Sequence, residues 1–261
     1  MIFSLVKFLI FFICAFLFSF SVFTLSCSEK TPAEPNPPEE QEPKLELLST
    51  VNIQVDEPSG LCFTIDRKAL WAVSDQTRKV YKVDFNGNVI KSLLYTGNDL
   101  EGVTIDPSDS TIWVAEEYLS QMVQLDTLGN ELNRVTVTGA AGNSGLEGIT
   151  INSINNHFFL LKEQDPGVLI ELDEAFNLLT YKRINFAFDF SGLFFESQNQ
   201  YLWIVSDQNE KVYKCDLSGS VINAYSIEAP QPEGIAVDIE NGFVYIVSDS
   251  HEKLYKFSIA E

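Results

Sequence analysis

Basic residues are scarce in this sequence, which has 17 Lys and Arg against 37 Asp and Glu and a formal net charge of −20. Phosphate binding needs clustered Lys and Arg, so this balance argues against a nucleic-acid partner and against electrostatic docking to anionic lipid headgroups. The P-loop, G-x-G-x-x-G, H-E-x-x-H and C-x-x-C motifs are all missing, which removes the enzyme classes that depend on them.

Cysteine is also scarce, and four residues are too few for a fold built on disulfides. Cys14 and Cys27 belong to an apolar N-terminal leader, whereas Cys62 and Cys215 lie in apolar strand patterns of the main body. We expect the latter two to be buried free thiols, with a disulfide between them as the alternative. The hydrophobic fraction of 45% and the 20 Phe exclude global disorder.

The N-terminal segment predicts export and membrane attachment. Residues 1–26 are almost all apolar, with Lys7 as the only charge, and the 18-residue run 8–25 is long enough to cross much of a bilayer. Leu25-Ser26-Cys27 resembles a bacterial lipobox, although Thr24 replaces the usual Leu. We therefore predict a signal peptide or lipoprotein leader over residues 1–26, with lipidation at Cys27. An uncleaved anchor and a released protein remain alternatives, and all three place the rest of the chain outside the cytoplasm. The predicted location is the cell envelope, with the propeller anchored to the plasma or outer membrane.

A spacer follows the leader. Residues 28–44 contain five Pro and five Glu and no aromatic residue, so they cannot bury a core. This composition predicts a stiff, extended tether over residues 27–44 between the membrane and an external domain.

The body of the chain, residues 45–261, is a fivefold repeat. Its recurring glycines are spaced by 42, 46, 44 and 42 residues: Gly60, Gly102, Gly148, Gly192 and Gly234. Each repeat reads as four short strands rich in β-branched and aromatic residues, which is typical of a propeller blade. The fifth repeat ends after three strands, and residues 45–55 have the composition of the missing fourth. The sequence thus predicts an all-β, five-bladed β-propeller of four-stranded blades, closed by an N-terminal strand that pairs with the last blade.

Two columns of acidic residues recur in the repeats. The residues before the glycines are Ser59, Glu101, Glu147, Ser191 and Glu233. The acids that end the second strands are Asp75, Glu116, Glu163, Asp207 and Asp249. Because strands of a meander alternate in direction, both columns should meet on one face of the ring, with the Glu column nearest the axis. Eight carboxylates in one place call for a counter-charge, and Ca²⁺, which takes six to eight oxygens, is the predicted ion. Structural roles remain the alternative. The Ser-Asp pairs could stabilise turns through side-chain to backbone hydrogen bonds, and the Glu-Gly pairs could connect neighbouring blades.

The motifs resemble those of one known family. Leu100-Glu101-Gly102, Leu146-Glu147-Gly148, Val205-Ser206-Asp207 and Val247-Ser248-Asp249, after a membrane anchor, are similar to the SdiA-regulated (YjiK/CarP-like) β-propeller family. The resemblance covers roughly residues 45–261 and implies an envelope protein with a signal or anchor. It also implies a link to calcium responses or a phytase-like activity. The chain departs from the repeat pattern at Ser59 and Ser191, where Glu is absent, and at Ala115-Glu116 and Lys162-Glu163.

These observations favour a binding module over an enzyme. A hydrolytic triad needs Ser, His and Asp together, yet His157 and His251 lie outside both acidic columns. We predict a membrane-tethered, extracytoplasmic propeller that binds Ca²⁺ and possesses no catalytic residues, with another envelope protein or a small ligand as further partner. The alternatives are a Ca²⁺-dependent hydrolase, phytase-like or lactonase-like, that uses the channel carboxylates, and a purely structural envelope protein.

Overall fold

The computed structural model describes residues 43–140 and 145–259, and these residues form strands and turns without a helix. This part of the chain accordingly contains no helix that could span a membrane. The predicted leader (residues 1–26), the lipidation site Cys27 and most of the predicted tether (27–44) lie outside the described residues.

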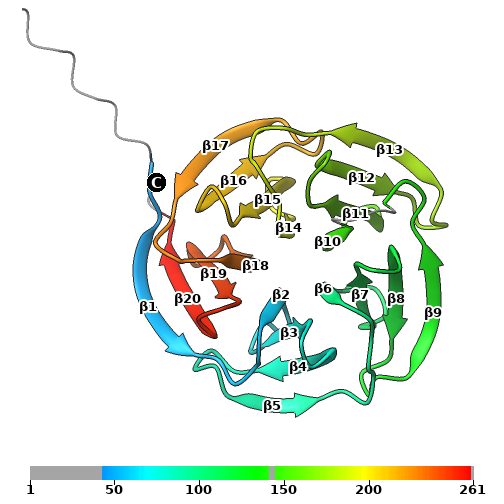
Figure 1. The fold of residues 1–261 in the computed structure, drawn as a ribbon, viewed down its shortest axis with the longest axis horizontal. Helices are drawn as coiled ribbons and strands as arrows, with labels where there is room; N and C mark the ends of the chain where they lie inside the picture. The colour runs from blue at the N-terminus through cyan, green and yellow to red at the C-terminus, as the bar shows by residue number, and fades with distance from the viewer. Residues whose placement is uncertain (1–42, 141–144, 260–261) are drawn as a thin grey trace, which may run out of the picture. The chain divides into compact units, whose positions relative to one another are not determined.

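Five four-stranded antiparallel sheets stand around a common axis, as Figure 1 shows. The first blade contains β2 (Pro58–Phe63), β3 (Leu70–Ser74), β4 (Lys79–Val83) and β5 (Val89–Ser92). The second contains β6 (Leu100–Ile105), β7 (Ile112–Glu116), β8 (Gln121–Leu125) and β9 (Glu131–Thr136). The third contains β10 (Leu146–Asn152), β11 (His157–Lys162), β12 (Val168–Leu172) and β13 (Leu178–Arg183). The fourth contains β14 (Gly192–Glu196), β15 (Tyr201–Ser206), β16 (Lys211–Cys215) and β17 (Val221–Ser226).

The fifth blade joins the two ends of the domain. It contains β18 (Pro232–Asp238), β19 (Phe243–Ser248), β20 (Lys253–Ser258) and, at its outer edge, β1 (Glu46–Asn52). β1 pairs antiparallel with β20, with Thr50 opposite Tyr255. The predicted five-bladed propeller and its closure by an N-terminal strand are both confirmed. Closure gives the last blade the same four strands as the others and leaves no unfinished sheet in the ring.

Burial explains the two kinds of strand pattern. The second strands β3 and β7 are buried along their whole length, because both faces pack against neighbouring blades. They therefore read as continuous apolar runs instead of an alternation. The outer strands β9 and β13 are largely exposed and correspondingly polar or mixed. Aromatic residues fill the spaces between blades, as where Trp113 of the second blade meets Phe158 of the third edge to face at 4.9 Å.

Aspartates close the hairpins between the third and fourth strands. The Asp84 carboxylate accepts hydrogen bonds from the backbone N–H groups of Asn86 and Asn88, each 2.9 Å long. Gly87 between them has a φ of +81°, a conformation that glycine adopts without strain. Asp126, Asp173 and Asp216 cap the same turn in the next three blades.

The repeat glycines are where the blades meet at the axis. A Cβ atom on Gly192 would lie 2.2 Å from the backbone oxygen of Glu233 in the next blade, and one on Gly60 would lie 2.6 Å from that of Glu101. These contacts are shorter than any side chain permits. The glycine column therefore sets how closely the first strands approach one another, and so the width of the central channel.

Candidate functional site

Bulges in the first strands aim side chains at the axis. The pairing register shifts between Leu100 and Gly102 in β6 and between Leu146 and Gly148 in β10. A bulge leaves one residue unpaired and redirects its side chain. That residue is Glu101 in β6 and Glu147 in β10, and corresponding shifts occur in β2 and β18. The repeated Glu-Gly pair thus combines a side chain turned into the channel with a residue small enough for the blades to touch.

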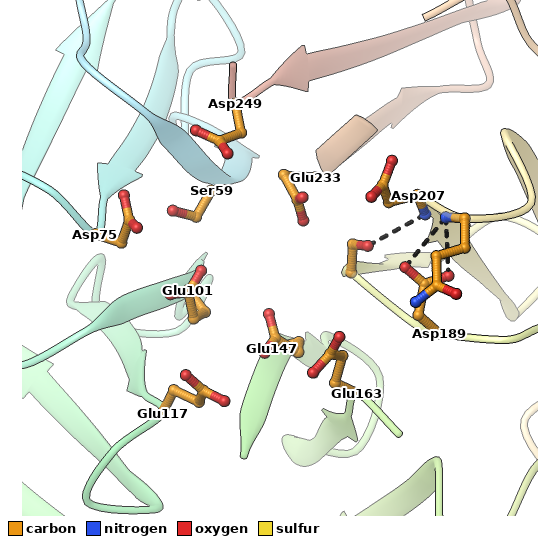
Figure 2. Close-up of a pocket in the computed structure, with 12 residues that line it drawn as sticks. Ser59, Asp75, Glu101, Glu117, Glu147, Glu163, Asp189, Asp207, Glu233 and Asp249 are labelled. Carbon is orange, nitrogen blue, oxygen red and sulfur yellow. Dashed lines mark hydrogen bonds between the residues drawn. The ribbon is translucent and has the colours of Figure 1, made fainter. Parts of the chain in front are cut away.

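The side chains gather in one cavity of about 260 Å³ at one mouth of the channel. Figure 2 shows carboxylates directed inward from all five blades. The lining residues are Ser59, Asp75, Glu101, Glu117, Glu147, Glu163, Asp189, Ser191, Asp207, Gln208, Glu233 and Asp249. Nine of these twelve residues are acidic, and none is Lys, Arg or His. The two His lie elsewhere: His157 contacts Glu171 at 2.8 Å, and His251 contacts Ser250 at 3.0 Å.

Seven of the eight predicted acidic site residues line this cavity, namely Asp75, Glu101, Glu147, Glu163, Asp207, Glu233 and Asp249. The placement of Glu116 in the cavity was wrong, and Glu117 occupies that place. Successive strand residues point to opposite sides, so Glu116 at the end of β7 faces into the blade. The sequence contains the signal for the correct assignment, because Glu117 lies 15 residues after Gly102, as Asp75 lies 15 after Gly60.

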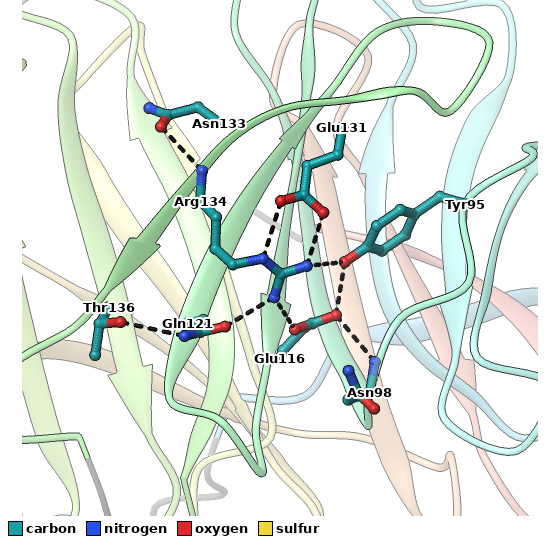
Figure 3. A network of polar contacts seen from close by, with 8 residues as sticks. All are labelled: Tyr95, Asn98, Glu116, Gln121, Glu131, Asn133, Arg134 and Thr136. Carbon is teal, nitrogen blue, oxygen red and sulfur yellow. Dashed lines mark hydrogen bonds and ion pairs between the residues drawn. The ribbon is translucent and has the colours of Figure 1, made fainter.

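Glu116 belongs to a buried polar network, drawn in Figure 3. Its carboxylate pairs with the Arg134 guanidinium at 2.6 Å and accepts hydrogen bonds from the Tyr95 hydroxyl at 2.7 Å and from the Asn98 backbone N–H at 2.9 Å. The network joins the end of β7 to the loop before β6, which carries Asp99. It therefore holds the backbone on either side of the cavity rim in the second blade.

A third acidic column was not anticipated. Glu57, Asp99 and Asp189 each lie three residues before a repeat glycine, in the segments EPSG, DLEG and DFSG. Asp189 is buried in the cavity wall and accepts hydrogen bonds from the Ser206 hydroxyl at 2.5 Å and the Gln208 backbone N–H at 3.1 Å. Asp99 lies beside Asp75 and Glu101. The recurrence in three repeats is the signal that could have identified this column.

The cavity concentrates uncompensated negative charge. Burial, followed by the nearby charges of Asp75 and Asp99, raises the pKa of Glu101 to about 8. Burial also raises the pKa of Glu147 and of Glu233 well above the ordinary value, with the Glu101 charge as the next cause for both. Burial and like charges both disfavour the ionised form. All three carboxyls are therefore harder to ionise than an exposed Glu, and a bound cation would favour their ionised form.

The donor set fits a hard divalent cation. Oxygen atoms of Asp75, Asp99 and Glu101 lie within 4.8 Å of one another, and so do oxygen atoms of Glu117, Glu147 and Glu163. The Oδ1 atom of Asp249 is buried and has no hydrogen-bond partner among the described residues. Ca²⁺ accepts carboxylate oxygens in flexible geometry, whereas the His and Cys ligands that Zn²⁺ favours do not line the cavity.

The channel narrows directly behind this cavity. The glycine column and the Leu, Val and Ile residues that follow it enclose only about 10 Å³ there. The cavity is therefore a blind cup that opens on one face of the ring. A separate cavity of about 180 Å³, lined by Thr and Phe residues among others, lies beyond the constriction.

Solved structures with a similar fold differ in function. The chain is similar to virginiamycin B lyase from Staphylococcus aureus, with a TM-score of 0.51 and 14% identity over 78% of this chain and 66% of the lyase. A gluconolactonase from Xanthomonas campestris matches with a TM-score of 0.58 and 10% identity over 88% of this chain and 99% of that protein. A chain of the nidogen/laminin complex matches with a TM-score of 0.55 and 13% identity, covering 73% of this chain and 72% of that chain. At these identities the likeness concerns the fold alone.

The sequence match is more specific. A family model described as SdiA-regulated matches residues 40–258, which include every blade. The Leu-Glu-Gly motifs inside that range supply two of the axial carboxylates in the cavity. This chain therefore belongs to the SdiA-regulated family.

Proposed function

We propose that this protein is a Ca²⁺-binding module, held at the outside of a membrane by its N-terminal segment. The observation that carries the proposal is a cup lined by nine carboxylates and by no cationic side chain. Burying so many like charges is costly without a counter-ion. A divalent cation bound only by the folded protein would offset that cost and stabilise the ring.

Thermal unfolding of the metal-stripped protein tests the proposal. At a Ca²⁺ concentration of 100 times the dissociation constant, a single site adds about 2.7 kcal/mol, which for a domain of this size corresponds to about 5–10 °C in Tm. We expect this rise in wild type and a much smaller one in Glu147→Gln. Glu174→Gln, which changes an exposed turn residue, is the matched control and keeps the full rise. An unchanged Tm in millimolar Ca²⁺ would contradict the proposal.

The membrane attachment rests on the leader pattern and the Pro/Glu-rich spacer. Metabolic labelling with an alkyne fatty acid measures it directly. Wild type should incorporate the label and sediment with membranes, whereas Cys27→Ser should lose the label. A label that persists in Cys27→Ser would refute lipidation at this residue, and protein found wholly in the soluble fraction would refute attachment.

A Ca²⁺-dependent hydrolase, acting on a lactone or a phosphate ester, is the second candidate. The observation in its favour is Glu101, whose pKa of about 8 suits proton transfer near neutrality. A bound Ca²⁺ would polarise a substrate oxygen or activate water. A lactone, as in the gluconolactonase with this fold, avoids the repulsion that an anionic ester meets in so acidic a cup. A lactonase and phosphatase screen with Ca²⁺ and with chelator, on wild type and Glu101→Gln, decides between the candidates.

A further inference from the structure

A groove of about 280 Å³ lies between the first and second blades, which are neighbours in Figure 1. It shares Thr64, Ile65 and Ile105 with the cavity beyond the channel constriction, so it opens at the end of the ring opposite the cup. Its lining also includes Trp71 and Lys82 of the first blade. We propose that this groove binds a small aromatic carboxylate. The inference concerns a second site and does not depend on the proposed Ca²⁺ binding.

Two positions that recur in every blade explain how the groove arises. The first is the third-strand residue that pairs with the central aromatic residue of the second strand, and its five members are Lys82, Gln124, Glu171, Lys214 and Lys256. The second lies two residues before that aromatic residue, and its members are Ala69, Thr111, His157, Tyr201 and Phe243. Residues on one face of adjacent strands are neighbours, including those one step along the diagonal, so the side chains at these two positions can meet.

In four of the five blades the two positions are in contact. Polar side chains join them at 2.9 Å in the second blade and at 2.8 Å in the third. In the fourth blade the Lys214 ammonium lies 4.3 Å from the centre of the Tyr201 ring, and in the fifth that of Lys256 lies 3.5 Å from the centre of the Phe243 ring. A lysine at the first position is therefore satisfied by an aromatic ring at the second.

The first blade is the exception, because Ala69 supplies neither a ring nor a polar group. Lys82 is half-buried, yet its ammonium makes no hydrogen bond, ion pair or ring contact within residues 43–140 and 145–259. The blade thus has the lysine of the fourth and fifth blades without the ring that covers their sheets. An aromatic ligand in the groove would supply that ring.

The charges that line the groove favour an anion. Lys91 lines it together with Lys82, and its Nζ donates one hydrogen bond, to the Thr127 backbone oxygen at 2.5 Å, which leaves two N–H groups for a ligand. Asp66 also lines the groove, but its carboxylate already accepts hydrogen bonds from the Thr64 hydroxyl at 2.7 Å and from a backbone N–H at 3.2 Å. Two ammonium groups thus face one engaged carboxylate, in a chain with 37 acidic and 17 basic residues. A ligand carboxylate would complement them with charge-assisted hydrogen bonds.

The rest of the lining favours an aromatic body. Trp71 is only 5% exposed and presents its remaining surface to the groove, and Ile65 and Ile105 lie at the rim. A ring packed against the Trp71 indole gains the stacking energy of an aromatic pair, and Lys82 can contact the same ring as Lys214 contacts Tyr201. Pockets for drug-sized ligands begin at about 300 Å³, so the groove suits a molecule of one or two rings.

Fluorine NMR titration of the full chain with para-fluorophenylacetate, in chelator, tests the inference. We expect saturable broadening of the ligand signal, and para-fluorophenylacetamide, its neutral isostere, should bind at least about tenfold more weakly. Lys82→Met keeps the length of the side chain without its charge and should weaken binding of the acid by a similar factor. Lys214→Met is the matched control and should leave the affinity unchanged, because Tyr201 already fills the equivalent place in the fourth blade. Ala69→Phe, which supplies the ring that Phe243 supplies in the fifth blade, should abolish binding.

Three results would overturn the inference. The first is no saturable binding of the acid to wild type. The second is equal binding of the acid and the amide, which would remove the role of the two lysines. The third is wild-type affinity in Lys82→Met, which would place the ligand elsewhere. Circular dichroism verifies that each variant is folded, and Lys82→Met alone decides if Ala69→Phe unfolds. Because the chelator excludes Ca²⁺, none of these results bears on the proposed function of the cup.

Discussion

Raising the pH of metal-free protein should weaken the fold. Glu101, Glu147 and Glu233 have pKa values raised by burial first and by neighbouring carboxylates second. In the unfolded chain these groups return to ordinary values near 4.5. Between that pH and their folded pKa, the folded state binds more protons than the unfolded state. The free energy of unfolding therefore falls as the pH rises through this window.

The size of the effect follows from Glu101. Its pKa is about 8 in the folded protein and 4.5 when unperturbed, and each pKa unit corresponds to about 1.4 kcal/mol. The difference amounts to about 5 kcal/mol from this residue, and Glu147 and Glu233 act in the same direction. The turn residues Asp84 and Asp126 have lowered pKa values, so their contribution to the free energy of unfolding is complete above about pH 5. They therefore do not oppose the loss of stability between pH 5 and pH 8.

Thermal unfolding in chelator at about pH 5, 6, 7 and 8 measures the effect. With about 2–4 °C per kcal/mol for a domain of this size, we expect a fall in Tm on the order of 10 °C, reversed by millimolar Ca²⁺. Glu101→Gln should make the fall in Tm smaller, because Glu147 and Glu233 still contribute, whereas the exposed control Glu174→Gln should leave the profile unchanged. A Tm that stays constant or rises from pH 5 to pH 8 without metal would refute the electrostatic reasoning.

Three further predictions concern the scaffold. Arg134→Met leaves the buried carboxylate of Glu116 without its cation and should lower the free energy of unfolding in urea by about 3 kcal/mol. Adding Glu116→Gln should recover part of that loss, and no recovery would show that the ion pair is not the cause. Gly192→Ala forces a Cβ to 2.2 Å from a backbone oxygen and should cost more than about 2 kcal/mol. Gly242→Ala, in open space but at a φ of +70°, should cost only about 1 kcal/mol, and equal losses would contradict the packing argument. Burial raises the pKa of Cys215 to about 12, so Cys62 and Cys215, which are free and buried in the described part of the chain, should react with a thiol reagent only after unfolding; rapid labelling of either residue in native protein would disprove this.

The fold could be predicted because each repeat carries the same local signals in the same register. Glycines at the axis, apolar second strands and Asp-capped hairpins each follow from contacts that recur five or four times. Closure by β1 was predictable since the last repeat lacked one strand, and an unpaired edge is unfavourable.

The site could be predicted only in outline. A one-residue error of register exchanged Glu116 for Glu117, and in a strand that error moves a carboxylate from the cavity into the blade. The partner that makes Glu116 tolerable, Arg134, lies two strands away, and its reach depends on packing that the sequence pattern does not contain. The division of the acids into two sets likewise depends on side-chain orientation in the assembled ring.

The pairing of β1 with β20 also determines when the ring of blades can close during folding. These two strands are separated by some 200 residues, and the last sheet has only three of its four strands until they pair. During synthesis β1 is made before the other strands and has no pairing partner until β20, after the four other blades, has also been made. Such a long-range contact makes ring closure a late and slow step. Glu233 and Asp249 reach the cup from β18 and from the residue after β19, so the cup itself does not wait for β1, and closure instead completes the outer edge of the ring.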